Sequence, residues 1–252
     1  MIKSLTERKY LATLTSSRKQ LQSIETMEKS AKIPEHQSVY ERLRDMILLG
    51  KFAPGQPLTI MGLAESLSVG MTPVREALRR LTAENALTTL GNRRIVVPQL
   101  SLKDIQDIYY LRFEIESELA GRAAGKIEKP QIAALIEIDA AIDRALDRGD
   151  IDAYLEYNNQ FHFNIYAIAE APVLLHATRS LWVQAGPGLR VVCGRYGTAN
   201  LPDKHSELLQ ALSAADCSGA ARAMRDDLQQ SLTLISTPAA QKNMIKSVEE
   251  PA

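Results

Sequence analysis

Hydrophobic residues recur at helical spacing along most of the chain. Between residues 37 and 50, for example, Val39, Leu43 and Ile47 fall on one face, and Gly50 stands where a helix ends. The same pattern predicts further helices over residues 60–67, 72–84, 102–126, 130–148, 151–170, 172–196 (broken near Gly186-Pro187-Gly188), 203–214 and 217–236. The chain is therefore expected to be mainly α.

The pattern changes around the third predicted helix. Thr72 is predicted as its N-cap, with Pro73 at the first helical position, which tolerates proline. Residues 87–90 and 95–97 then predict two short strands around a basic turn. Helix, turn, helix, tight turn, helix and hairpin is the order of a winged helix-turn-helix. The later helices, joined by short turns, predict an antiparallel all-helical bundle.

The expected organisation has five parts. They are an N-terminal arm (1–35), a winged helix-turn-helix (36–98), a linker (99–101), a helical bundle (102–236) and a flexible tail (237–252). The arm is either a loosely held tail or an addition to an interface, because its apolar stripe is interrupted by Ser and Thr.

Composition adds limits on location and partners. No apolar run approaches the ~18 residues of a membrane span, and the N-terminus has no apolar segment of a secretory signal. The two cysteines, Cys193 and Cys217, form no disulfide framework or CxxC pair. We therefore expect a cytoplasmic protein with no membrane partner.

The net charge of zero conceals a division along the chain. Residues 36–100 hold eight Lys or Arg and five Asp or Glu, whereas residues 101–252 hold fifteen and twenty-one. A basic N-terminal part joined to an acidic C-terminal part fits a nucleic-acid reader fused to a domain of another kind.

The third predicted helix offers candidate DNA contacts. Thr72, Arg75 and Arg79 share one helix face because they are three and four residues apart. Arg75 is suited to bridge guanine O6 and N7, while Thr72 and Arg79 would contact phosphates. The alternative is that the arginines form a solvated face paired with glutamates such as Glu76 and Glu84.

The predicted hairpin supplies a second set of DNA contacts. Asn92, Arg93 and Arg94 lie at its tip. A cationic wing follows the DNA backbone or enters the minor groove. Helix and wing together indicate a double-stranded DNA partner.

Three stretches resemble the GntR family of bacterial transcription regulators: residues 50–58 (GKFAPGQPL), 63–67 (LAESL) and, most specifically, 72–81 (TPVREALRRL). Family members usually carry Ser-Arg just before the last stretch, where this chain has Gly70-Met71. The resemblance implies a transcription regulator that binds a palindromic operator as a homodimer. This departure removes one arginine that usually contacts a base, so the contact is made by Arg75 or the wing instead, or is absent.

Four polar residues in the bundle form a candidate metal site. Asn158 and His162 are four residues apart on one helix, while His205 and Asp227 lie on the last two helices. Two imidazoles with oxygen ligands suit zinc, nickel or manganese. From spacing alone the signal is weak, because a helical histidine is more often an ordinary core or surface group.

Residues 101–236 resemble the FadR-type C-terminal ligand-binding domain, known as FCD, which opens on a segment like residues 110–116 (YLRFEIE). Asn158, His162, His205 and Asp227 match its metal-binding pattern, except that Asn158 replaces an aspartate and Asp227 a histidine. The resemblance implies dimerisation and a divalent metal, with zinc as the first expectation. The alternative is that the same polar cluster holds an organic ligand directly.

The resemblance also implies that the effector is a small carboxylate. Arg112, Arg190 and Arg195 are the candidates to pair with it, since guanidinium binds carboxylate in a bidentate manner. The chain is thus predicted to be a ligand-responsive repressor, although the sign of regulation could be reversed.

Two other classes of protein remain as alternatives. One is a metal-dependent enzyme acting on a small carboxylate, against which the chain has no GxSxG, HExxH, P-loop or dinucleotide motif. The other is a DNA-binding protein whose sensor domain no longer responds to any metabolite.

Overall fold

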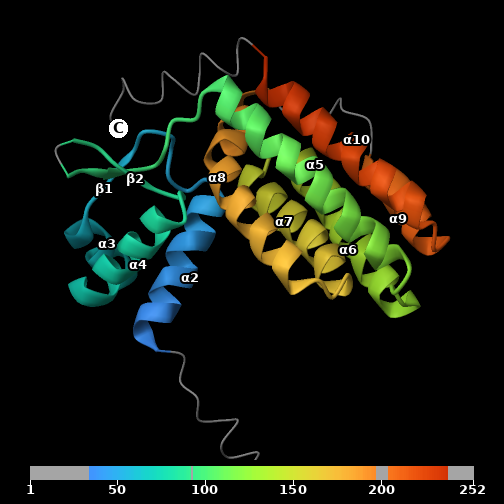
Figure 1. Cartoon of the computed structure of the whole chain (residues 1–252), viewed down its shortest axis with the longest axis horizontal. Helices are drawn as coiled ribbons and strands as arrows, with labels where there is room; N and C mark the ends of the chain where they lie inside the picture. Colours follow the sequence, from blue (N-terminus) through green and yellow to red (C-terminus); the bar gives the residue numbers. More distant parts are fainter. Residues whose placement is uncertain (1–33, 92, 197–203, 238–252) are drawn as a thin grey trace, which may run out of the picture.

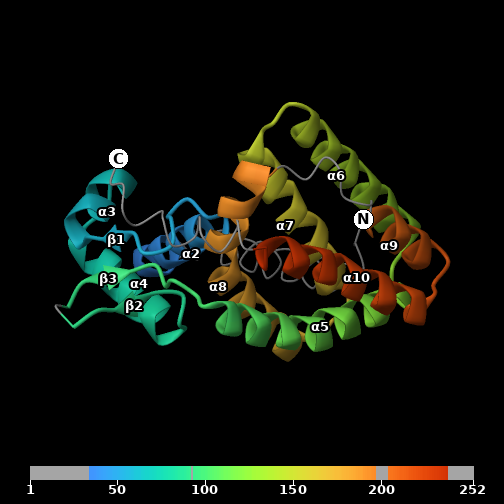
Figure 2. The same cartoon turned by 90° about the horizontal axis from the view of Figure 1, so that it is seen from above.

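The computed structural model describes residues 34–91, 93–196 and 204–237, without the side chains of residues 194–196. A small head and a larger bundle of helices lie next to one another, with α2 and α8 between them (Figures 1 and 2). The mainly α fold class is confirmed. Apart from residues 34, 35 and 237, the predicted arm and tail lie outside the described residues.

The head is a winged helix-turn-helix. It consists of α2 (Glu35–Leu48), β1 (Pro57–Leu58), α3 (Ile60–Leu67), α4 (Met71–Ala83), β2 (Thr88–Thr89) and β3 (Ile95–Val96). The strands are antiparallel in the order β1-β3-β2, and Val96 lies opposite both Pro57 and Thr88. The hairpin was predicted, whereas β1 was not, because Pro57-Leu58 lacks the β-branched residues that mark the other two strands.

The start of α4 corrects one prediction. The helix begins at Met71 with Gly70 as the N-cap, so Thr72 is not the capping residue. Pro73 is the third helical residue. It is tolerated there because the first four N–H groups of a helix have no partner within it.

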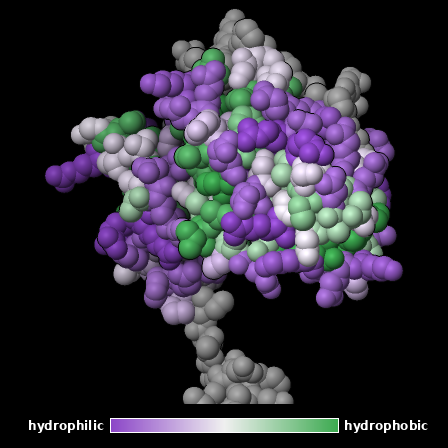
Figure 3. Space-filling view, turned by 45° about the vertical axis from the view of Figure 1, so that its right-hand side comes forward, coloured by the Kyte–Doolittle hydropathy of each residue, from purple (hydrophilic) through white to green (hydrophobic). Residues whose placement is uncertain are grey.

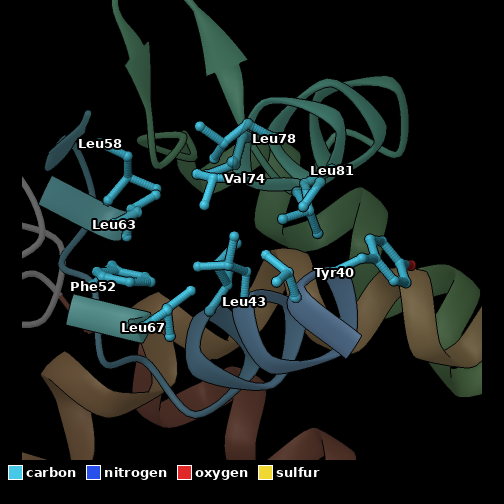
Figure 4. Packing of buried hydrophobic residues seen from close by; sticks show 14 of the residues in the cluster. Tyr40, Leu43, Phe52, Leu58, Leu63, Leu67, Val74, Leu78 and Leu81 are labelled. Carbon is cyan, nitrogen blue, oxygen red and sulfur yellow. The ribbon is translucent and has the colours of Figure 1, made fainter. Parts of the chain in front are cut away.

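The core of the head lies between its three helices and the sheet. Leu43 and Tyr40 on α2 face Val74, Leu78 and other residues of α3 and α4 (Figure 4). The positions that share one face of each predicted helix are therefore the ones that are buried.

The bundle consists of longer helices. They are α5 (Leu102–Ala124), α6 (Lys129–Asp147), α7 (Ile151–Ile168), α8 (Pro172–Tyr196), α9 (Lys204–Ser213) and α10 (Cys217–Ile235). Ser101 and Asp104 form a capping box that starts α5 after the linker. Along the described chain, no helix is both long and apolar enough to cross a membrane.

The predicted break in α8 is wrong, because the helix runs through Gly186-Pro187-Gly188. Gly186 is instead a contact residue, since a Cβ atom there would lie 2.0 Å from the carbonyl oxygen of Leu48 on α2. One turn earlier, Val183 enters the hydrophobic core of the head. The head and the bundle therefore share a packed junction.

Ion pairs at the start of α7 reinforce this junction. The Asp152 carboxylate accepts from Lys51 Nζ at 2.7 Å and also pairs with Arg190. Lys51 follows α2 in the head, while Asp152 and Arg190 belong to the bundle. These groups are at least partly exposed, so they fix orientation more than they add stability.

Candidate functional site

The recognition helix α4 exposes the three residues predicted to contact DNA. Thr72, Arg75 and Arg79 are all exposed. Arg75 makes no hydrogen bond or ion pair with the part of the chain that the structure describes. Arg79 pairs with Glu76, with 2.6 Å between nitrogen and oxygen. Arg75 is thus available to a base edge, whereas Arg79 must first leave its glutamate.

Arg80, next to Arg79, has a structural role. It pairs with Glu84 at 3.0 Å, donates to Gln37 at 2.9 Å, and places its guanidinium carbon 3.6 Å from the ring centre of Tyr40. Tyr40 in turn donates to Glu84 at 2.7 Å. This network joins α4 to α2 and so orients the recognition helix.

The wing presents its basic residues at the tip of the hairpin. Arg93 and Arg94 are exposed, and Arg93 has a left-handed backbone with φ of 63°. Its N–H donates to the carbonyl of Leu90 at 2.8 Å, which closes the turn. Asn92 lies outside the described residues.

In the bundle, the four predicted metal ligands line one cavity of about 200 Å³. His162 Nε2 lies 3.5 Å from one oxygen of Asp227, and His205 Nε2 lies 3.9 Å from the other. One ligand atom from each of these three residues can be chosen so that all lie within 4.8 Å of one another. Ligands about 2.1 Å from one tetrahedral zinc ion lie roughly 3.4 Å apart, so small side-chain movements suffice to bind it.

The other ring nitrogen of His205 contacts a carboxylate. Nδ1 lies 2.9 Å from Asp139 Oδ1 on α6. Because an ionised carboxylate only accepts, Nδ1 carries a proton, and Nε2 is the nitrogen that a neutral His205 would offer to a metal. A carboxylate behind an imidazole is the usual support of a metal-binding histidine.

The protonation of His162 follows from a chain of buried hydrogen bonds. Tyr166 has one hydroxyl hydrogen, which it donates to Glu116 at 2.5 Å. The contact of 3.1 Å between Tyr166 and His162 Nδ1 therefore requires the imidazole to donate. Nε2 of His162 is then unprotonated and lies toward Asp227.

Burial strongly affects the charges of this cluster. Burial lowers the pKa of His162 well below its usual value, and the nearby His205 and Arg112 lower it further. Burial also raises the pKa of Asp227, although His205 and Arg112 oppose the shift. A neutral His162 and a poorly solvated carboxylate are groups that gain from a divalent cation.

Asn158 is buried in the same cavity, one helical turn before His162 on α7. Its amide oxygen is a possible fourth ligand, as the sequence predicted. The donor set of two nitrogens and two oxygens fits a borderline divalent metal. That all four residues ligate one ion remains a prediction.

The three candidate effector arginines differ in position. Arg112 lines the cavity, is buried, and forms two hydrogen bonds to Glu116, from Nε at 2.6 Å and from a terminal nitrogen at 3.3 Å. Burial alone would lower the pKa of Arg112, but the Glu116 carboxylate outweighs it and raises the pKa.

Arg190 is not among the residues that line this cavity, and its contact with an effector stays a prediction. Its guanidinium donates to Asp152 and lies 3.5 Å from the carbonyl oxygen of Leu49, at the junction with the head. The spacing along α8 could not reveal this, because the junction depends on the packing of α2. The side chain of Arg195 lies outside the described residues.

Sequence reasoning missed several residues of the cluster. Glu116 lies four residues after Arg112 on the same helix, so the spacing could have revealed their ion pair. Asp139 and Tyr166 come from other parts of the chain, and no local pattern marks them. Trp182 also lines the cavity and lies against Arg112, with 4.6 Å from the guanidinium carbon to the ring centre.

Comparisons with known proteins agree with this architecture. Residues 35–97 match the family described as "Bacterial regulatory proteins, gntR family", and residues 107–230 match the FCD domain. The HTH-type transcriptional regulator McbR of Escherichia coli is 30% identical over 197 residues, which cover 77% of this chain and 89% of McbR. The HTH-type transcriptional repressor RspR of the same species is 28% identical over 78% of this chain and 87% of RspR.

A solved structure is also similar. The structure described as E. coli McbR/YncC superposes with a TM-score of 0.76 at 29% identity, and the match covers 81% of this chain and 97% of that one. The named relatives are regulators of transcription rather than enzymes.

Proposed function

The chain belongs to the GntR family of bacterial regulatory proteins and is a transcription regulator rather than an enzyme, and we propose that it is a repressor that a small carboxylate releases from its operator. The observation that carries this proposal is the polar cavity in the bundle. Two imidazoles and a carboxylate converge there beside a buried arginine.

A divalent metal would be held by His162, His205 and Asp227, with Asn158 as the fourth ligand. Zinc is the first expectation, and nickel or manganese are the alternatives. The bound ion would supply positive charge that attracts the carboxylate. Asp139 and Tyr166 would keep both imidazoles oriented, because each contacts a ring nitrogen that faces away from the cluster.

Arg112 would bind the other end of the effector. A guanidinium has five N–H donors, and the hydrogen bonds to Glu116 use two of them. Because the ion pair is already buried, the arginine is held in place before the ligand arrives. A carboxylate is therefore a better fit than a cation, because the metal and Arg112 are both positively charged and would repel a cation.

The signal would reach the head through α7. This helix carries Asn158 and His162 in the cavity and Asp152 at the junction, where it pairs with Lys51 of the head. Effector binding that favours one position of α7 would favour one orientation of the head. The two recognition helices of a dimer would then lose their register on DNA.

A homodimer on a palindromic operator completes the proposal. One winged helix reads few base pairs, whereas two related by a dyad double the contacts. Leu102, Tyr110 and Leu111 on α5 are exposed large apolar side chains. Hydrophobic surface also gathers in the middle of the face shown in Figure 3, which is a candidate region for the partner subunit.

Replacing Arg75 with alanine tests the DNA-binding part of the proposal. We expect operator affinity to fall by 1–3 kcal/mol, or about 5- to 150-fold, because a bidentate contact to guanine is lost. The measurement is fluorescence anisotropy at fixed salt, with an operator selected from random DNA. Arg122→Ala, an exposed arginine of the bundle, is the matched control. An equal loss on random DNA would show a phosphate contact instead.

Elemental analysis of protein purified without chelators tests the metal. We expect about one equivalent of metal per chain, lost in His205→Ala and kept in His176→Ala, because His176 is an exposed histidine outside the cavity. Titration of the metal-free proteins with zinc should show similar affinity for the wild type and His176→Ala and weaker affinity for His205→Ala. Equal metal contents in the two variants, or none in the wild type, would contradict the assignment.

A further inference from the structure

A second cavity lies where the head, the linker and the bundle meet. Its volume is about 360 Å³, compared with about 200 Å³ for the polar cavity. Pro54 comes from the head, Leu102 and Ile105 from the start of α5, and Pro187 from α8. Figure 1 shows the start of α5 beside α8 and the end of α10 in this region. The cavity is distinct from the proposed metal site.

The wall of this second cavity is mostly apolar. Among the described residues that line it, none carries a charged side chain. Tyr109 donates its hydroxyl to Ser231 at 3.1 Å, and Ser101 donates to Asp104 at 2.6 Å. Gln184 donates to the carbonyl of Ser180 at 3.2 Å. A charged ligand would therefore lose its hydration without gaining a counter-charge, so the cavity suits an uncharged molecule.

Pro187 interrupts the backbone hydrogen bonds of α8, because it has no N–H to donate. Gln184, Ala185 and Pro187, on the same stretch of α8, line the cavity.

We infer that this cavity is a second ligand site, for an uncharged and mainly aromatic or aliphatic small molecule. Its volume falls within the range of about 300–1,000 Å³ that is typical of small-molecule pockets, which occur preferentially between domains. An extended protein partner fits less well, because the walls come from several separate parts of one chain.

Binding at this site would act directly on the head. The ligand would touch Pro54 and Pro98 of the head on one side and α5 and α8 on the other. It would thus favour one orientation of the head, and by linkage DNA would change the affinity for the ligand equally. This input requires neither the metal nor the carboxylate.

The probe for the test is N-phenyl-1-naphthylamine, an uncharged aromatic amine with one N–H and environment-sensitive fluorescence. We expect saturable binding of about one probe per chain of the full-length protein. Ala185→Phe should weaken it at least about tenfold, which is 1.4 kcal/mol, because the new ring fills the cavity. Ala134→Phe, on the exposed side of α6, should leave the affinity unchanged. EDTA or added zinc should also have no effect.

Three results would overturn the inference. The first is no saturable binding to the wild type, and the second is equal binding to Ala185→Phe and Ala134→Phe. The third is binding that appears only after deletion of residues 238–252 or after dilution to monomers. That result would show that the tail or a second copy of the chain occupies the cavity.

Discussion

Replacing Gly186 with alanine is expected to lower the free energy of unfolding by about 3 kcal/mol, at the upper end of the usual cost of overpacking. The added Cβ would lie 2.0 Å from the carbonyl oxygen of Leu48 and 2.7 Å from its carbonyl carbon. These are backbone atoms, so no side-chain rotation relieves the clash. Helices α2 and α8 must separate, which also withdraws Val183 from the core of the head.

The opposing effect on helix propensity is smaller. Alanine favours a helix interior over glycine by only about 0.5–1 kcal/mol. Chemical denaturation followed by circular dichroism measures the difference. Gly125→Ala is the matched control, because its Cβ would meet nothing closer than 3.5 Å and its φ of −78° suits alanine. Equal midpoints for the two variants would show that α2 and α8 are not in close contact.

The same glycine shows where sequence reasoning about the fold stops. Gly-Pro-Gly at residues 186–188 indicates a break by local rules, yet α8 continues because α2 packs against Gly186. The helices were predictable, because their buried faces follow a simple period, and so was the hairpin, because β-branched residues flank a basic turn. The N-cap of α4 was not, because several positions of the first turn accept Pro73.

The candidate site was predictable to a similar extent. His162, His205 and Asp227 were found because the resemblance aligns distant positions, and the structure brings them into one cavity. Asp139 and Tyr166 were not, because a carboxylate or hydroxyl that supports an imidazole has no fixed spacing from it. Arg190 is the opposite case, since its chemistry suits an effector carboxylate but its guanidinium pairs with Asp152 at the junction with the head.

Replacing Glu116 with glutamine is expected to lower the free energy of unfolding by about 3–5 kcal/mol, because it leaves the charge of Arg112 buried without a partner. Both side chains of this pair are almost completely buried, with 4% and 0% exposed. The amide keeps the shape of the carboxylate, so the decrease in the free energy of unfolding reports the lost charge rather than lost packing. Tyr166 also loses its acceptor oxygen or binds it more weakly, which loosens the orientation of His162.

Glu118→Gln is the matched control on the same helix. Glu118 pairs with Arg122 at 2.8 Å, also four residues apart, but the two side chains are about half exposed. Solvent screens such a pair, so its loss should cost no more than about 0.5 kcal/mol. Urea denaturation of both variants separates the two cases. If Glu116→Gln and Glu118→Gln lose equal stability, another group balances the charge of Arg112. That result would contradict the proposal that Arg112 binds the effector carboxylate.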